Sequence, residues 1–446
     1  MTLARRWRSA LGLAVLLAAF VPLTCAPLAA AQAVPTPTSQ PTARPPEPKQ
    51  AYTLPPGELA KAVALSRISD ILAIVGSLWG IAFLWLLLAT RASSSVESWT
   101  QRIARRPWLQ GLIFFALFLI AVFLAGLPLD VIGHLASRRY GISVQGWASW
   151  LGEEGKSLGL SLLVGAPLLL FFNWMVRRWP RRFWLCAWLI TLPLMLLATF
   201  AEPLVIDPLF NKFEPLQKTD PALVQQLEKV VKRTGIDIPP SRMFLMKAST
   251  KTNGINAYVT GFGPSKRIVV WDTTINRIPD NEILFIFGHE TGHYVLHHIA
   301  KGLTLAGAGL FFVYWGCAVF AGWLARRFGP RWGATGLASR TGFVVLLLTL
   351  SLAGFLLEPV SNAVSRHFEH QADIYGQEAI HGIVPNPQKT VVAAFNALGR
   401  AWLSNPHPNP FFQFWLGSHP SIQQRATFAE HYDPWKNGGH GKYFMH

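Results

Sequence analysis

Long apolar runs alternate with short polar and basic stretches along most of this 446-residue chain. Six of the runs are each about as long as the ~20 residues that a helix needs to cross a bilayer. Hydrophobic residues make up 51% of the chain and charged residues 14%, whereas a soluble protein carries roughly 25% charged residues. The pattern predicts six transmembrane helices, near residues 69–90, 109–132, 158–176, 183–200, 302–325 and 341–357.

The first 64 residues have a different pattern. Three arginines precede an apolar run over residues 11–20, and small residues follow it, which is typical of a cleavable secretory signal over residues 1–33. A retained signal anchor is the alternative. Residues 34–64 begin with a stretch rich in Pro, Thr and Gln that has hardly an apolar side chain to bury, and they predict a tether.

About a hundred residues between the fourth and fifth apolar runs have the character of a soluble domain. Asp220 can cap a helix whose first turn suits Pro221. Short β-type runs follow, and a Gly-Phe-Gly-Pro sequence over residues 261–264 favours a turn between the last two. The pattern predicts helices over 221–233 and 281–300 and strands over 243–246, 257–260 and 267–271, the last two strands forming a hairpin.

The net charge of +17 changes the picture little. A nucleic-acid-binding protein would gather its arginines on one folded domain, whereas here they cluster in short runs between apolar segments. That distribution indicates membrane topology and no nucleic-acid partner. Cys25, Cys186 and Cys317 lie in apolar stretches without paired spacing, which excludes a disulfide framework or a thiolate metal site. Any metal must therefore be held by histidine and carboxylate.

The strongest chemical signal is the HETGH sequence over residues 289–293. His289 and His293 are four residues apart, so on a helix they share a face and direct two imidazoles at one ion. Glu290 then lies beside the metal, where it can take a proton from an activated water. A run of surface histidines is the alternative for the motif taken alone.

A catalytic zinc site has three protein ligands and one open position, so one ligand lies outside the motif. His297 is the nearest candidate, but a straight helix carries it away from the ion. The metzincin pattern is excluded because Ile299 stands where that class has its third histidine. Glu369 and Asp373 are four apart on a helix predicted to continue out of the last span. Alone they indicate a solvated acidic face; beside HETGH, Glu369 can bind zinc while Asp373 orients a ligand histidine.

Several linked motifs make the sequence resemble the type I CAAX prenyl proteases, which are integral-membrane zinc endopeptidases related to the HtpX-type quality-control proteases. The matching segments span about residues 109–428 in one order: DPLFNKF at 207–213, NAY at 256–258 with GFGPSKRIVVWDT shortly after it, HETGH at 289–293, SRHFEHQAD at 365–373, and His419-Pro420 with Arg425.

The resemblance implies a mainly α fold. It consists of a multi-span transmembrane helical bundle that encloses a chamber, with a zincin-type α+β metalloprotease domain split by the last two spans. The corresponding segments are four membrane helices over 65–203, a first protease part over 204–301, two spans over 302–357 and a second protease part over 358–446.

The resemblance also implies roles for single residues. One zinc ion per chain (Zn2+) would have Glu369 as its third ligand, with Asp373 and Arg366 behind the ligands. His419 and Arg425 correspond to residues that reach the site and stabilise the oxyanion; outside the family, a His-Pro pair in a loop carries no such meaning.

The same resemblance implies a substrate-binding edge. Asn256, Ala257 and Tyr258 would pair with the substrate backbone as an added strand, a mode in which main-chain bonds supply affinity without sequence preference. Ordinary turn chemistry explains Asn256 equally well from the sequence alone.

The expected activity is hydrolysis of peptide bonds in a peptide or protein substrate, by an enzyme whose other partner is the lipid bilayer. Lipidated CAAX substrates are favoured by the resemblance, and quality-control cleavage of membrane or exported proteins is the alternative. A metal-binding transporter or receptor would carry charges inside its spans, whereas Asp70 and Asp130 lie near span ends. An intramembrane-cleaving protease would need a less polar helix around HETGH.

Arginine counting and family analogy disagree on the side of the membrane. The stretches 91–106, 177–182 and 326–340 carry most of the positive charge. If they are cytoplasmic, both protease parts face the periplasm across a bacterial-type inner membrane. The family analogy places the zinc domain on the cytosolic side, and the pair Arg138-Arg139 would then no longer lie outside.

Overall fold

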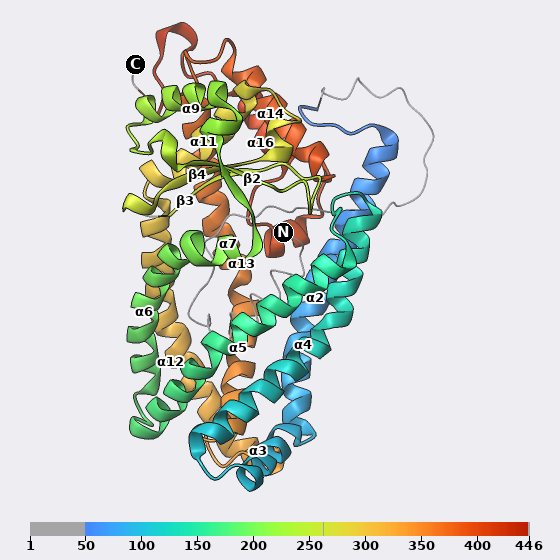
Figure 1. The fold of residues 1–446 in the computed structure, drawn as a ribbon, viewed down its shortest axis with the longest axis vertical. Helices are drawn as coiled ribbons and strands as arrows, with labels where there is room; N and C mark the ends of the chain where they lie inside the picture. Colours follow the sequence, from blue (N-terminus) through green and yellow to red (C-terminus); the bar gives the residue numbers. More distant parts are fainter. Residues whose placement is uncertain (1–49, 262, 445–446) are drawn as a thin grey trace.

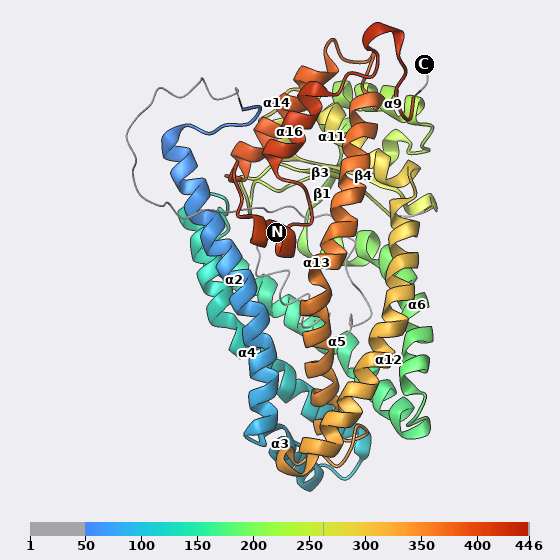
Figure 2. The same cartoon turned by 180° about the vertical axis from the view of Figure 1, so that it is seen from behind.

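The computed structural model describes residues 50–261 and 263–444 as an elongated molecule, with a helical bundle at one end and a mixed α/β domain at the other (Figures 1 and 2). The predicted signal over residues 1–33 and most of the predicted tether lie outside the described residues.

Six helices of the described chain are long and apolar enough to cross a membrane, which confirms the predicted number. The fourth continues from α6 through a π-helical turn, Glu202–Ile206, into the short α7, Asp207–Phe210. The last is far longer than its apolar run and carries on into the second domain, as predicted (Figure 2). The spanning helices are α2 (Pro56–Ala89), α4 (Pro107–Arg139), α5 (Trp147–Arg178), α6 (Phe183–Ala201), α12 (His298–Trp332) and α13 (Arg340–Ala379).

The N-terminal end of α13 is held by α3 (Ala92–Ile103). The carboxylate of Glu97 accepts hydrogen bonds from the backbone amides of Arg340 at 3.0 Å and Thr341 at 2.9 Å. The first amides of a helix have no partner within the helix and carry partial positive charge, so a carboxylate stabilises them. Glu97 therefore fixes the start of the helix that carries Glu369 further along.

A small sheet forms the centre of the mixed domain, with strand order β1-β2-β4-β3. Strands β2, β3 and β4 have the predicted bounds, and β3 and β4 form the predicted antiparallel hairpin. Gly261 has φ of 88°, and a Cβ there would lie 2.2 Å from a backbone oxygen, so the turn requires glycine. The strands are β1 (Phe213–Pro215), β2 (Met243–Met246), β3 (Ala257–Thr260) and β4 (Arg267–Trp271).

The core of this domain draws on sequence before and after the last two spans. Leu227 of α9, Phe285 of α11 and Phe395 of α14 are all fully or almost fully buried in one cluster. The two protease parts therefore fold as one unit, although α12 and the first part of α13 separate them along the chain. The remaining helices are α8 (Leu216–Thr219), α9 (Pro221–Thr234), α10 (Asp272–Ile275), α11 (Asp280–Val295), α14 (Pro387–Ala401), α15 (Pro410–Leu416) and α16 (Ile422–His431).

The helix predicted over residues 281–300 is two helices. α11 ends at Val295, His297 adopts a left-handed backbone with φ of 57°, and α12 begins at His298. The sequence has no Gly or Pro at this point to signal the break, so the pattern predicted a continuous helix.

The end of the predicted tether also differs. Residues from Pro56 onward are already helical, and Tyr52 is fully buried. The Tyr52 hydroxyl donates to the carbonyl oxygen of Ser404 at 2.8 Å, and its amide donates to the side chain of Gln423 at 2.8 Å. A lone aromatic residue in a polar stretch has no periodic pattern, so only the folded domain supplies its partners.

The arginine-rich loops gather at the end of the bundle opposite the sheet (Figure 1). Nε of Arg91 donates to the carbonyl of Arg331 at 2.7 Å, and Nη2 of Arg340 donates to the carbonyl of Pro107 at 3.0 Å. The C-terminal end of α4 lies at the other end, where the side chain of Asn253 donates to the carbonyl of Gly141 at 2.8 Å.

Candidate active site

The site forms where α11 crosses α13 at very short range. A Cβ on Gly376 would lie 2.7 Å from the backbone nitrogen of His289, and a Cβ on Gly288 would lie 3.2 Å from the carbonyl oxygen of Gly376. Two glycines at the crossing thus allow the backbones to approach, which brings side chains of the two helices to one point.

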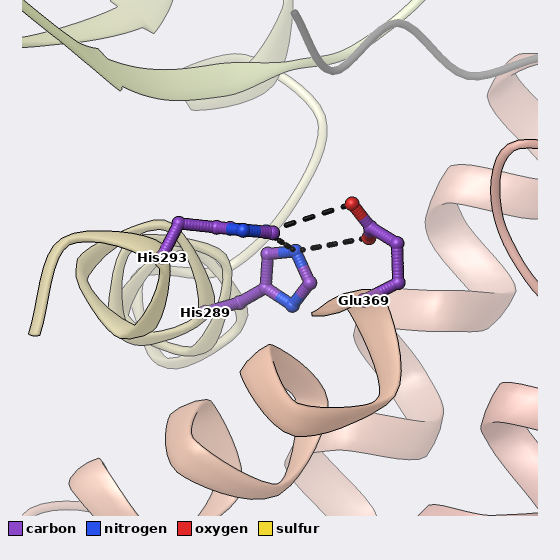
Figure 3. A group of neighbouring side chains, drawn as sticks. All are labelled: His289, His293 and Glu369. Atoms are coloured by element: carbon purple, nitrogen blue, oxygen red, sulfur yellow. Dashed lines mark hydrogen bonds and ion pairs between the residues drawn. The ribbon is translucent and has the colours of Figure 1, made fainter. Parts of the chain in front are cut away.

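Three side chains converge there: His289 and His293 from α11 and Glu369 from α13 (Figure 3). The two Nε2 atoms are 3.3 Å apart, and Glu369 Oε2 and Oε1 lie 3.4 and 3.5 Å from Nε2 of His289 and His293. Zinc bound tetrahedrally by such atoms at ~2.0–2.1 Å requires them roughly 3.3 Å apart. The two histidine nitrogens have this spacing, and one ligand atom from each of the three residues lies within 4.8 Å of the others, so the donor set fits a zinc ion.

Asp373 holds the first histidine from behind. Its Oδ1 lies 2.9 Å from Nδ1 of His289, on the ring atom that faces away from the other ligands. Burial would lower the pKa of His289, but hydrogen bonds with Asp373 and Glu369 outweigh it and raise the pKa to about 10. In the metal-free protein a proton on His289 therefore balances charge that a bound cation would otherwise balance.

Glu290, on α11, faces the sheet, where it contacts the backbone of Val259 on β3. Burial raises its pKa from 4.5 to about 7, opposed by the charge of His289 and by a hydrogen bond with the backbone of Val259. A carboxylate with a pKa near neutrality can accept a proton and release it again, which suits a general base.

The two residues expected at the oxyanion differ in position. Nε2 of His419 lies 3.1 Å from Glu369 Oε2, so this imidazole reaches the ligand group. The guanidinium of Arg425 instead pairs with Asp373, and its Nη2 lies 3.6 Å from Glu369 Oε2. The structure thus brings both residues to Glu369, but Arg425 makes its shortest hydrogen bonds with Asp373.

Arg366 does not lie behind the ligands, contrary to the prediction. Its Nη1 reaches the carbonyl oxygens of Gln413 at 3.3 Å and Phe414 at 3.4 Å, and also that of Gly417. The last carbonyls of a helix attract a cation, so the long side chain leaves α13 to stabilise the end of α15. That end leads directly into the loop with His419.

The predicted substrate edge is an edge strand, because β3 pairs with β4 at the end of the described sheet. The amide and carbonyl of Asn256 are already bonded, to the Thr274 hydroxyl at 2.8 Å and to the Trp271 amide at 3.1 Å. The Tyr258 hydroxyl donates to Asp207 at 3.0 Å.

His298 and Gln371 lie near the ligands although the sequence did not predict them there. Nδ1 of His298 lies 3.1 Å from Nδ1 of His293, and its Nε2 lies 2.9 Å from Oε1 of Gln371. His297, which the sequence suggested as the nearest extra candidate, is exposed in the turn. His298 is five positions after His293, which on a continuous helix places the two on different faces, so no periodic signal pointed to this pair.

Comparisons with known proteins agree with this arrangement. Residues 217–433 match the family described as peptidase family M48, and residues 38–212 match the family described as CAAX prenyl protease N-terminal, five membrane helices. The chain is 36% identical over 380 residues to a protein of Bacillus subtilis described as an uncharacterized metalloprotease, YhfN, covering 84% of this chain and 86% of the relative. It is 26% identical over 340 residues to CAAX prenyl protease 1 of Saccharomyces cerevisiae, covering 72% of each.

A solved structure shares the fold. The crystal structure of S. mikatae Ste24p superposes with a TM-score of 0.74 at 23% sequence identity, covering 88% of this chain and 92% of that chain. These matches confirm the predicted membrane metalloendopeptidase and do not favour a transporter or receptor. The chain belongs to peptidase family M48 and is an integral-membrane metalloendopeptidase.

Proposed function

We propose that this protein hydrolyses peptide bonds with one zinc ion held by His289, His293 and Glu369. The observation that supports this most directly is the convergence of the three side chains: the two Nε2 atoms are 3.3 Å apart, as on one edge of a zinc tetrahedron, and a Glu369 oxygen lies within 3.5 Å of each. The bound ion would polarise the scissile carbonyl and acidify the attacking water. Glu290 accepts the proton of that water and passes it to the leaving amine, a task that its pKa of about 7 suits.

The free edge of β3 supports the proposed mode of peptide binding. The Trp271 amide bonds to the carbonyl of Asn256, which makes these two a hydrogen-bonded pair of the antiparallel ladder. Because such pairs alternate along a ladder, the backbone groups of Ala257 and Val259 point away from β4. The bond between the Val259 backbone and Glu290 agrees with this. A substrate strand added to this edge would therefore run past the catalytic base.

His419 is our candidate for stabilising the oxyanion. Its Nε2 lies next to Glu369, and the Ser418 hydroxyl lies 2.9 Å from its Nδ1 and can fix the ring. An imidazole N–H directed at the developing negative charge lowers the barrier more than it stabilises the ground state. Arg425 and Asp373 act on His289 rather than on the substrate.

We further propose that the substrates are CAAX-type peptides carrying a lipid, because several of the relatives are named CAAX prenyl proteases. The test is cleavage of a farnesylated CAAX peptide and the same peptide without the lipid, each with and without a zinc chelator. Chelator-sensitive cleavage of the lipidated peptide alone is the expected result. Equal cleavage of both would reject the lipid requirement and favour quality-control proteolysis.

A substitution at the base tests the mechanism itself. Glu290→Gln keeps the size and the hydrogen-bonding ability of the side chain but cannot take up the proton, so we expect wild-type zinc content with turnover reduced by about 10²-fold or more. Zinc content is measured by elemental analysis and turnover with the peptide above. Peptidase activity near the wild-type level in this variant would reject Glu290 as the base.

We also propose that the site opens on the non-cytoplasmic side of a bacterial inner membrane. The gathering of arginine-rich loops at the opposite end of the bundle supports this orientation. The test is a pair of reporter fusions, one after Arg178 and one at the C-terminus. A C-terminal reporter that is active in the cytoplasm would reject the proposed orientation.

A further inference from the structure

His293 has a partner on the ring atom that faces away from the other ligands. Its Nδ1 lies 3.1 Å from Nδ1 of His298, whose Nε2 lies 2.9 Å from Oε1 of Gln371. His298 is almost fully buried, and its ring stacks on Phe368 with centroids 4.4 Å apart. Three side chains from α11, α12 and α13 therefore form one continuous hydrogen-bonded row that starts at a ligand.

The direction of the hydrogen bonds follows from the ligand role of His293. A neutral imidazole has one N–H and one acceptor nitrogen. If Nε2 of His293 binds the metal, its proton is on Nδ1 and is donated to Nδ1 of His298. His298 then carries its own proton on Nε2 and donates it to the amide oxygen of Gln371. Each of the four ring nitrogens is then either a donor, an acceptor or a metal ligand, and the row ends at the amide oxygen of Gln371, which only accepts.

We propose that His298 and Gln371 are positioning residues that hold His293 in the tautomer and orientation required for metal binding. This inference rests on the proposed function, because it requires His293 to be a zinc ligand. The opposite tautomer of His298 would place its proton towards Nδ1 of His293 and leave Nε2 of His293 protonated, where it cannot bind a cation. Gln371 favours the productive state because its oxygen is directed at Nε2 of His298 and can accept the proton there.

The break between α11 and α12 makes this row possible. On a continuous helix His298 would point about 140° away from His293. The left-handed residue His297 turns the chain, so that the first residue of α12 returns to the site. Residues other than glycine rarely adopt this backbone conformation. Here the residue that adopts it, His297, directly precedes His298, which contacts the metal-ligand candidate His293.

The two ligand histidines are thus supported in different ways. His289 is held by Asp373, whose negative charge is balanced by Arg425. His293 is held by a neutral histidine and a neutral amide. A neutral row needs no counterion of the kind that Arg425 supplies to Asp373.

The experiment measures zinc affinity of the full-length protein in detergent, by competition with a fluorescent chelator at fixed pH. His298→Phe keeps the aromatic stack on Phe368 and removes the acceptor, and we expect about 10–100-fold weaker zinc binding. Gln371→Leu removes the end of the row and should weaken binding likewise, whereas Gln371→Glu keeps an oxygen there and should restore most of it. His297→Asn removes an exposed imidazole from a position where Asn is tolerated, and it serves as the control with wild-type affinity.

Wild-type zinc affinity in His298→Phe would overturn the proposal. Equal weakening by Gln371→Leu and Gln371→Glu would also overturn it, since packing alone would then explain the effect. The Gln371 pair decides the question even if His298→Phe does not fold, which melting of the metal-free protein reveals. Failure of the proposed function would look different: the wild-type protein would take up no stoichiometric zinc, or His293→Ala would bind it as tightly as wild type.

Discussion

Arg425 meets Asp373 side-on, with Nε 2.9 Å from Oδ2 and Nη2 2.6 Å from Oδ1. The same Oδ1 lies 2.9 Å from Nδ1 of His289. This pair joins α16, near the C-terminus, to the helix that carries Glu369 and to the helix that carries the histidines. The charge of Arg425 allows a buried carboxylate to hold a metal ligand without a net buried charge.

We expect Arg425→Met to be strongly destabilising, because it leaves the Asp373 carboxylate buried without its counterion. Breaking a buried pair in this way costs about 3–5 kcal/mol. Arg425→Lys keeps the charge but not the two parallel hydrogen bonds, so its effect should be intermediate. The measurements are the melting temperature in detergent and the zinc affinity; a Met variant that matches the wild type in both would contradict the prediction.

The stability of the metal-free protein should depend on Glu290. Its pKa is about 7 in the folded protein and 4.5 as an ordinary glutamate, so the folded state binds this proton more tightly. The stabilisation is therefore complete below about pH 4.5 and is lost as the pH rises through 7, by at most about 1.4 kcal/mol per pH unit. Glu290→Gln lacks this contribution, and the stability of wild type relative to it should fall over that range. A difference that does not change with pH would show that the pKa is not raised.

The glycine at the helix crossing should be required for the metal site. A Cβ on Gly376 would lie 2.7 Å from the backbone of His289, so Gly376→Ala must push α13 away from α11 and separate Glu369 from the histidines. We expect at least tenfold weaker zinc binding, as for loss of an outer support of a ligand. Gly354→Ala is the matched control, because this position of α13 has no atom within 4 Å of a new Cβ. Identical zinc affinities in the two variants would contradict the prediction.

Proline on β3 should separate substrate binding from folding. Ala257→Pro removes an amide that points to the free edge, so it should raise KM by roughly three- to tenfold, as for a lost hydrogen bond of about 1 kcal/mol. Tyr258→Pro removes an amide that points to β4 and should instead destabilise the sheet. Steady-state kinetics and melting distinguish the two effects; an unchanged KM in Ala257→Pro would argue against strand addition.

Local sequence patterns predicted many of the helices, strands and site residues of this protein. A span is visible because some 20 neighbouring residues must be predominantly apolar. The strands and the helix capped by Asp220 follow from short-range propensities. His289, Glu290 and His293 are equally local, because one helical turn sets their relation. Glu369 and Asp373 were found for the same reason, as a pair on one helix face beside a motif that lacked a ligand.

Other features depend on contacts between distant segments. Arg366 turns to the carbonyls of α15 because that helix end lies within its reach, and Tyr52 is buried by residues more than 350 positions away. No periodic pattern in the sequence points to either of these contacts, because the two segments of each contact are far apart along the chain.

By itself, the sequence determined the membrane helices, the hairpin of β3 and β4 and the chemistry of the HETGH motif, because each depends on residues close together along the chain. Only the tertiary structure decided how that chemistry is supported. The chain breaks at His297, returns His298 to His293 and sets Arg425 behind Asp373. These relationships follow from packing of α11, α12, α13 and α16, in which the position of each side chain depends on elements far away along the chain.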